Sequence, residues 1–185
     1  MTTYLFALLS VFLPGILQPI TPSWRFLLLI FLMTFLLPVL NFGFLKLFGS
    51  IKSIHMYERK DRIMPFMFIT ILYVVITYMF YHNFQVRSVL KLMEIITAMV
   101  IVSTAITFFY KVSVHSIAVC GLVGILLPLN NAADGLLLYP TIGTLIVAGV
   151  VMSSRLQLNA HVLREVMYGA AIGFLIGFGG VILLF

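Results

Sequence analysis

Long apolar runs fill this 185-residue sequence and constrain its fold more than any other feature. Hydrophobic residues make up 63% of the chain and charged residues only 9%. An average soluble domain has roughly 25% charged residues, and a soluble core of this size could not bury so much apolar surface. The runs therefore predict a lipid environment. They are continuous rather than alternating, which favours helices, because helices satisfy their own backbone polar groups in lipid.

The sequence predicts an all-α integral membrane protein, a bundle of six to seven transmembrane helices forming one domain over residues 1–185. Roughly 20 apolar residues cross a bilayer. The first run is short and interrupted by Pro14 and Pro19, so we expect it to cross poorly or to kink. The seven apolar runs are 4–20, 24–48, 66–81, 89–110, 116–129, 136–152 and 166–185.

Potentially chemical side chains gather in alternate connections between these runs. The connections after the second, fourth and sixth runs lie on one membrane face, whether or not the first run crosses. We therefore expect one face to hold nearly all candidate site residues. The three connections contain Arg59 and Arg62, then Lys111 and His115, then Arg155, His161 and Glu165.

The last connection holds the densest polar chemistry. His161 and Glu165 are four residues apart, which places them on one helix face. A carboxylate there can accept a hydrogen bond from one imidazole nitrogen and leave the other free, as in an activated histidine. The start of a helix also favours an anion. An interfacial histidine with an ordinary helical contact is the alternative interpretation.

Basic and hydroxyl side chains near this pair could hold a phosphate group. Arg155 offers a planar fork that matches phosphate, although it could instead extend to the membrane surface. Ser113 and His115 open a predicted helix, where a hydroxyl suits an anion and a histidine could donate a proton. Arg59 and Arg62 precede Pro65 and could share a face, or belong to a solvated charge cluster.

Gly169, Gly173 and Gly177 recur at every fourth position of the last run. Such a stripe of small residues lets two membrane helices approach closely. We expect it to form a packing seam rather than a chemical site.

The last connection also resembles the third motif of the type 2 phosphatidic acid phosphatase (PAP2) superfamily. That motif reads Ser-Arg-x5-His-x3-Asp, and this chain has Ser154, Arg155, His161 and Glu165 at the same spacing, with glutamate for aspartate. The second motif, Pro-Ser-Gly-His, is matched by Ser113 and His115 without its proline and glycine.

The first motif of that superfamily, Lys-x6-Arg-Pro, is the least well matched. Lys52 and Arg59 have the correct spacing, but Lys60 stands where proline belongs. Arg59 and Arg62 before Pro65 are a plausible substitute. The resemblance spans residues 52 to 169. The short length of the chain and its motif style also resemble small membrane PAP2-like proteins of bacteria.

The resemblance implies a role for each candidate residue. His161 is the nucleophile that forms a phosphohistidine, Glu165 orients it, and His115 protonates the leaving oxygen. The phosphate-binding residues are Arg155, Ser113, Ser154, Arg59, Arg62 and Lys52. Lys111 is outside the motifs but could add positive charge. No metal or other cofactor is expected, and the sequence has no carboxylate cluster suited to a divalent cation.

These features together predict a membrane lipid phosphatase. Its substrate would be a lipid phosphate or a polyprenyl diphosphate, such as undecaprenyl diphosphate, and nucleic acid is not an expected partner. A catalytically silent relative that binds or transports lipid phosphates is the alternative. The resemblance also implies the bacterial inner membrane, with the site on its outer face.

Overall fold

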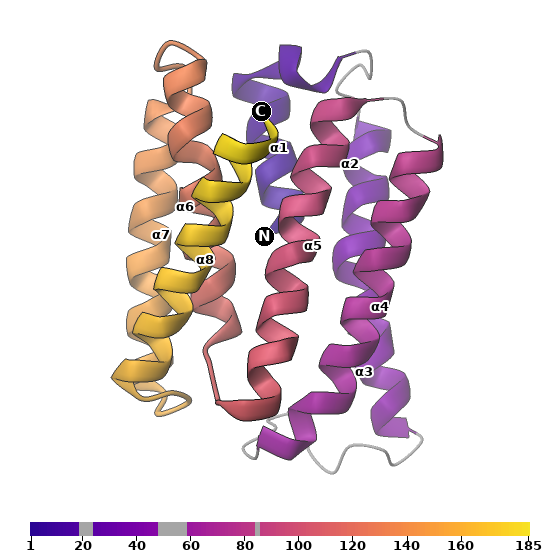
Figure 1. Cartoon of the computed structure of the whole chain (residues 1–185), viewed down its shortest axis with the longest axis vertical. Helices are drawn as coiled ribbons and strands as arrows, with labels where there is room; N and C mark the ends of the chain where they lie inside the picture. Colours follow the sequence, from indigo (N-terminus) through magenta and orange to yellow (C-terminus); the bar gives the residue numbers. More distant parts are fainter. Residues whose placement is uncertain (19–23, 48–58, 84–85) are drawn as a thin grey trace.

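The computed structural model describes residues 1–18, 24–47, 59–83 and 86–185, and the described residues are helical throughout apart from short connections. Figure 1 shows the helices in chain order. They are α1 (Thr2–Phe12), the 3-10 helix η1 (Pro14–Leu17), α2 (Trp24–Phe31), the π-helix η2 (Leu32–Leu36), α3 (Leu37–Leu47), α4 (Arg59–Asn83), α5 (Arg87–Phe109), α6 (Val114–Ala132), α7 (Leu138–Gln157) and α8 (Leu163–Leu184).

Six helices in the described residues are long and apolar enough to cross a membrane. They are Trp24–Leu47, which combines α2, η2 and α3, and then Arg62–His82, Arg87–Phe109, Val114–Ala132, Leu138–Gln157 and Leu163–Leu184. The coarse prediction of a helical, multi-pass membrane protein is therefore confirmed.

The first apolar run forms only the short helix α1. It ends at Phe12, and Pro14 starts the turn η1 that follows. Proline at that position provides no backbone N–H to continue an α-helix. The eleven residues of α1 span about 16 Å at 1.5 Å per residue, which is half of a bilayer core. The expected interruption of this run near Pro14 is therefore present.

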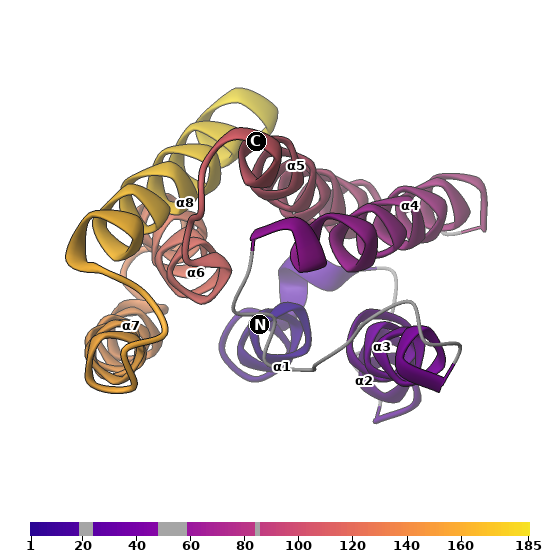
Figure 2. The ribbon, with the colours of Figure 1, turned by 90° about the horizontal axis from the view of Figure 1, so that it is seen from below.

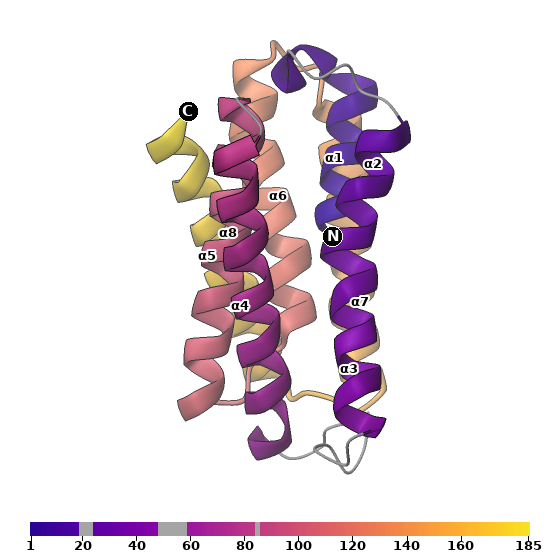
Figure 3. The same cartoon turned by 90° about the vertical axis from the view of Figure 1, so that its right-hand side faces the viewer.

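The helices form two rows with α6 between them. Seen from below, α4, α5 and α8 lie in one row, and α7, α1 and the α2–α3 helix lie in the other (Figure 2). The side view separates the same two rows (Figure 3). Threonine pairs join α4 to α5, because the hydroxyls of Thr70 and Thr104, and of Thr77 and Thr97, lie 2.7 Å apart.

The glycine stripe is the closest helix contact in the bundle. Added Cβ atoms at Gly169, Gly173 and Gly177 would meet backbone carbonyls of α6, and at Gly169 the distance to the Ser113 oxygen would be 2.7 Å. The predicted packing seam is therefore confirmed. It fixes the start of α8 against the start of α6.

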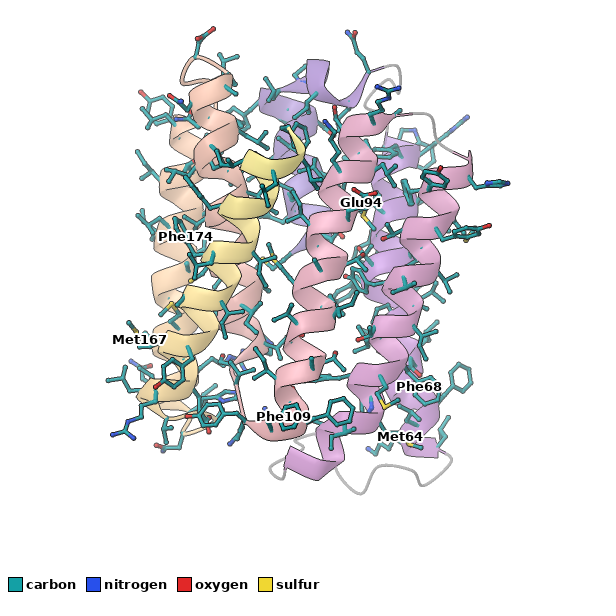
Figure 4. All side chains as sticks on the ribbon, in the orientation of Figure 1. Met64, Phe68, Glu94, Phe109, Met167 and Phe174 are labelled. Carbon is teal, nitrogen blue, oxygen red and sulfur yellow. The ribbon has the colours of Figure 1, made fainter. Side chains whose placement is uncertain are left out.

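Apolar side chains cover the outside of the bundle. Phe68, Phe109 and Met167 are exposed and project outwards in Figure 4. Such a surface suits the hydrocarbon of a bilayer. The buried core lies between the rows instead, and includes Phe6, which packs edge-on against Phe26 with ring centroids 5.8 Å apart.

Candidate functional site

Three helix N-termini meet at one end of the bundle. Helices α3, α5 and α7 end there, and α4, α6 and α8 begin there, at the lower end of Figure 1. The shared face predicted for the three polar connections is therefore present in the structure. Each of the three helix starts has free backbone N–H groups that favour an anion next to it, whereas the ends of α3, α5 and α7 carry the opposite partial charge.

His161 and Glu165 form the central pair of this site. His161 lies in the connection between α7 and α8, Glu165 lies in the first turn of α8, and both are buried. The distance from His161 Nδ1 to Glu165 Oε2 is 2.6 Å. An ionised carboxylate only accepts hydrogen bonds, so Nδ1 carries the proton and Nε2 keeps its lone pair. Glutamate therefore reaches the His161 ring despite its extra methylene.

The turn before His161 depends on Asn159, which the sequence analysis did not single out. Helix α7 ends at Gln157, and Asn159 has a positive φ of 50°. The amide of Asn159 donates to the carbonyl of Leu156 (3.0 Å), and that of Ala160 donates to the carbonyl of Arg155 (3.2 Å). These bonds define a Schellman motif, in which asparagine can replace the usual glycine. An asparagine just beyond a polar helix end was the available signal.

Ser113 joins the segment between α5 and α6 to the start of α8. Its backbone amide donates to the carbonyl of Glu165 at 3.2 Å. Its side chain is completely buried and caps α6, accepting bonds from the amide and the hydroxyl of Ser116 at 3.3 and 2.8 Å. The structure thus gives Ser113 a capping role, and a contact with phosphate stays a prediction.

Cationic side chains surround the pair. Lys111 Nζ lies 3.9 Å from Glu165 Oε2. Arg62, in the first turn of α4, interacts electrostatically with Glu165 and His161. His115 interacts electrostatically with Arg155, His161 and Arg62. Residues from α4, α6, α7 and α8 therefore place their charged and imidazole groups at the same end of the bundle, where they affect one another electrostatically.

Arg155 has a buried donor without a partner. Its Nε has no hydrogen-bond acceptor among the described residues. Buried polar groups are almost always paired, so an unpaired guanidinium nitrogen suggests an acceptor that binds there. An oxyanion matches this donor in charge and geometry.

The local field affects the protonation of His161. Burial lowers the pKa of its imidazole below the ordinary value, and the charges of Arg62 and Lys111 act in the same direction. The hydrogen bond and charge of Glu165 raise it in part. The net lowering keeps His161 neutral near pH 7, as a nucleophile or a hydrogen-bond acceptor requires.

Three predicted phosphate-binding residues remain: Lys52, Arg59 and Ser154. Lys52 lies outside the described residues, and Arg59 begins α4 but its side chain is not described. The hydroxyl of Ser154 donates to the carbonyl of Val151 at 2.8 Å. Their predicted phosphate contacts remain predictions.

The fold and the site define a multi-pass helical membrane protein with a buried histidine–carboxylate pair among cations at one end of the bundle. Comparisons with models of known protein families, with curated proteins and with solved structures found no match to the chain.

Proposed function

We propose that the chain is a membrane lipid phosphatase of the PAP2 type, which hydrolyses a lipid phosphate or a polyprenyl diphosphate. The observation that carries the proposal is the 2.6 Å contact from His161 Nδ1 to Glu165 Oε2. It directs a neutral Nε2 away from the carboxylate, which is the arrangement that makes histidine a nucleophile.

The proposed reaction has two displacements. In the first, Nε2 of His161 attacks phosphorus, the bond from phosphorus to the lipid oxygen breaks, and His115 gives that oxygen a proton. In the second, water attacks phosphorus, the bond from phosphorus to Nε2 of His161 breaks, His115 takes a proton from the water, and inorganic phosphate leaves. Both steps use positioned acid–base groups, and water is the only other reactant.

Charge neutralisation supports this reaction. Phosphoryl transfer depends mainly on positioning and on stabilising the charge of the phosphoryl oxygens. The buried Nε of Arg155 supplies a donor that otherwise lacks a partner. Arg62, Lys111 and the start of α6 add positive potential around it.

Phosphate release from purified protein tests the proposal. We expect release from lipid phosphates in the presence of a chelator, and its loss in His161→Ala. Arg155→Lys keeps the charge but not the planar fork, so we expect kcat/KM to fall by about 10- to 100-fold. Arg87→Lys is the matched control, because Arg87 is exposed at the other end of α5 and should be insensitive.

Trapping of the intermediate provides a second readout. A labelled phosphate should remain on the wild-type protein after rapid acid-free denaturation and be absent from His161→Ala. Unchanged release in His161→Ala would contradict the mechanism. Tight binding of lipid phosphates without any release would instead favour a silent binding or transport protein.

A further inference from the structure

A cavity of about 320 Å³ lies next to the candidate site, between α1 and helices α4, α5 and α6. Thr2 and Leu5 line it from α1, and Met99 and Leu122 line it from α5 and α6. His115 also lines it, and His115 interacts electrostatically with Arg155 and His161. The cavity and the cationic site therefore share one side chain.

The cavity runs along α6 from the site towards the middle of the bundle. Its lining residues on α6 extend from Val114 to Ile125, on one helix face. Eleven steps of 1.5 Å give a length of about 16 Å, close to the depth of one leaflet. The wall is mainly aliphatic, which suits hydrocarbon rather than a headgroup.

The dimensions admit one chain. The volume is about twice that of a ~150 Å³ apolar cavity that holds one benzene molecule, so about a dozen carbon atoms fit. About a dozen carbon atoms in line also match the length of the cavity, so one extended chain accounts for both its volume and its length.

The short helix α1 and the π-helix η2 help to build this cavity. Pro38 has no N–H for the carbonyl of Thr34 four residues earlier, and the hydroxyl of Tyr73 donates to that carbonyl at 3.1 Å. The same hydroxyl lies 3.2 Å from the Thr2 hydroxyl. Thr2, Thr34 and Tyr73 all line the cavity, so these bonds hold α1, η2 and α4 around it.

We propose that this cavity binds the single hydrocarbon chain of the substrate while its phosphate occupies the cationic site beyond His115. The assignment rests on the proposed function for its phosphate end. It names a substrate class: lipid phosphates with one chain, such as an alkyl, lysoglycerolipid or polyprenyl phosphate, in preference to diacyl lipids. A chain longer than the cavity continues into the bilayer.

Photocrosslinking of the inactive protein tests the chain site without turnover. The probe is dodecyl phosphate with a diazirine near the chain end, added to His161→Ala protein in nanodiscs. We expect labelling of the cavity walls on α5 and α6, mapped by mass spectrometry. Ala118 lines the cavity, so Ala118→Leu should reduce that labelling at least about tenfold by filling the space. Ala171→Leu, on the exposed face of α8, should leave it unchanged.

Turnover then separates the two proposals. With otherwise wild-type protein, kcat/KM for a one-chain phosphate should exceed that for diacyl phosphatidic acid by about tenfold. Ala118→Leu should lower kcat/KM for the one-chain phosphate. The control variant Ala171→Leu should have the same value as the wild type. If Ala118→Leu abolishes the labelling but the wild-type protein releases no phosphate, the chain site is retained and the phosphatase proposal is rejected. Labelling unchanged in Ala118→Leu, or equal turnover of one-chain and diacyl lipids, would overturn the chain site.

Discussion

The backbone amide of Ser113 donates a hydrogen bond to the carbonyl of Glu165, at a distance of 3.2 Å. This bond joins the start of α6 to the first turn of α8. His115 lies two residues after Ser113, and His161 lies four residues before Glu165. The two imidazoles interact electrostatically. The junction thus couples the two histidines that the proposed reaction requires.

Replacing Glu165 with glutamine tests the orienting contact. The side-chain amide of glutamine can donate to Nδ1 and so favour the opposite tautomer, in which Nε2 is protonated. We expect phosphate release to fall by about 10²-fold or more, with lipid-phosphate affinity nearly unchanged. Arg164→Gln is the control, because Arg164 is adjacent but exposed. Equal losses of affinity and turnover in Glu165→Gln would indicate a structural role for the carboxylate.

The pH profile reports on the imidazole of His161. Burial lowers its pKa, so the neutral nucleophile persists below the ordinary histidine value of 6.5. We expect kcat/KM to fall as the pH is lowered, with the midpoint of the fall below pH 6.5. Glu165 raises this pKa, so the midpoint should move to still lower pH in Glu165→Gln. An acid limb above 6.5 would contradict this electrostatic description.

Asn159 should tolerate glycine but not valine. Its φ of 50° is comfortable for glycine and strained for a β-branched side chain, at a cost of about 1–2 kcal/mol. We expect Asn159→Val to lower both stability and phosphate release, because the Schellman turn positions His161. Asn159→Gly should retain both. Thermal unfolding in detergent and a release assay provide the measurements, and an active, stable valine variant would show that the turn is not required.

The glycine seam predicts a sharp difference within α8. A methyl group at Gly173 would meet the backbone of Ile117, whereas one at Gly179 has nothing within 4 Å. We expect Gly173→Ala to destabilise the bundle by about 1–3 kcal/mol and Gly179→Ala to have little effect. Unfolding temperatures of the two variants in the same detergent measure the contrast. Equal temperatures would show that α6 and α8 separate without cost.

The sequence was sufficient for features that depend on local spacing. Continuous apolar runs predict spanning helices, four-residue glycine spacing predicts a seam, and four-residue spacing of His161 and Glu165 places both on one helix face. Alternation of the connections also predicted one polar end, because each spanning helix reverses direction. Those properties follow from helix geometry and bilayer thickness alone.

Only the tertiary structure decided features that depend on distant segments. The hydrogen bond between Ser113 and Glu165 spans 52 positions of sequence, and no local pattern encodes it. The cavity likewise requires α1 to end at Phe12 and to lie across from α4, α5 and α6, which form the opposite wall. The hydrophobicity of a residue in the sequence is the same whether its side chain faces lipid, the core or a cavity. The chain's own sequence therefore determined which helices form and which residues are candidates for chemistry, and close packing between helices decided what space lies next to them.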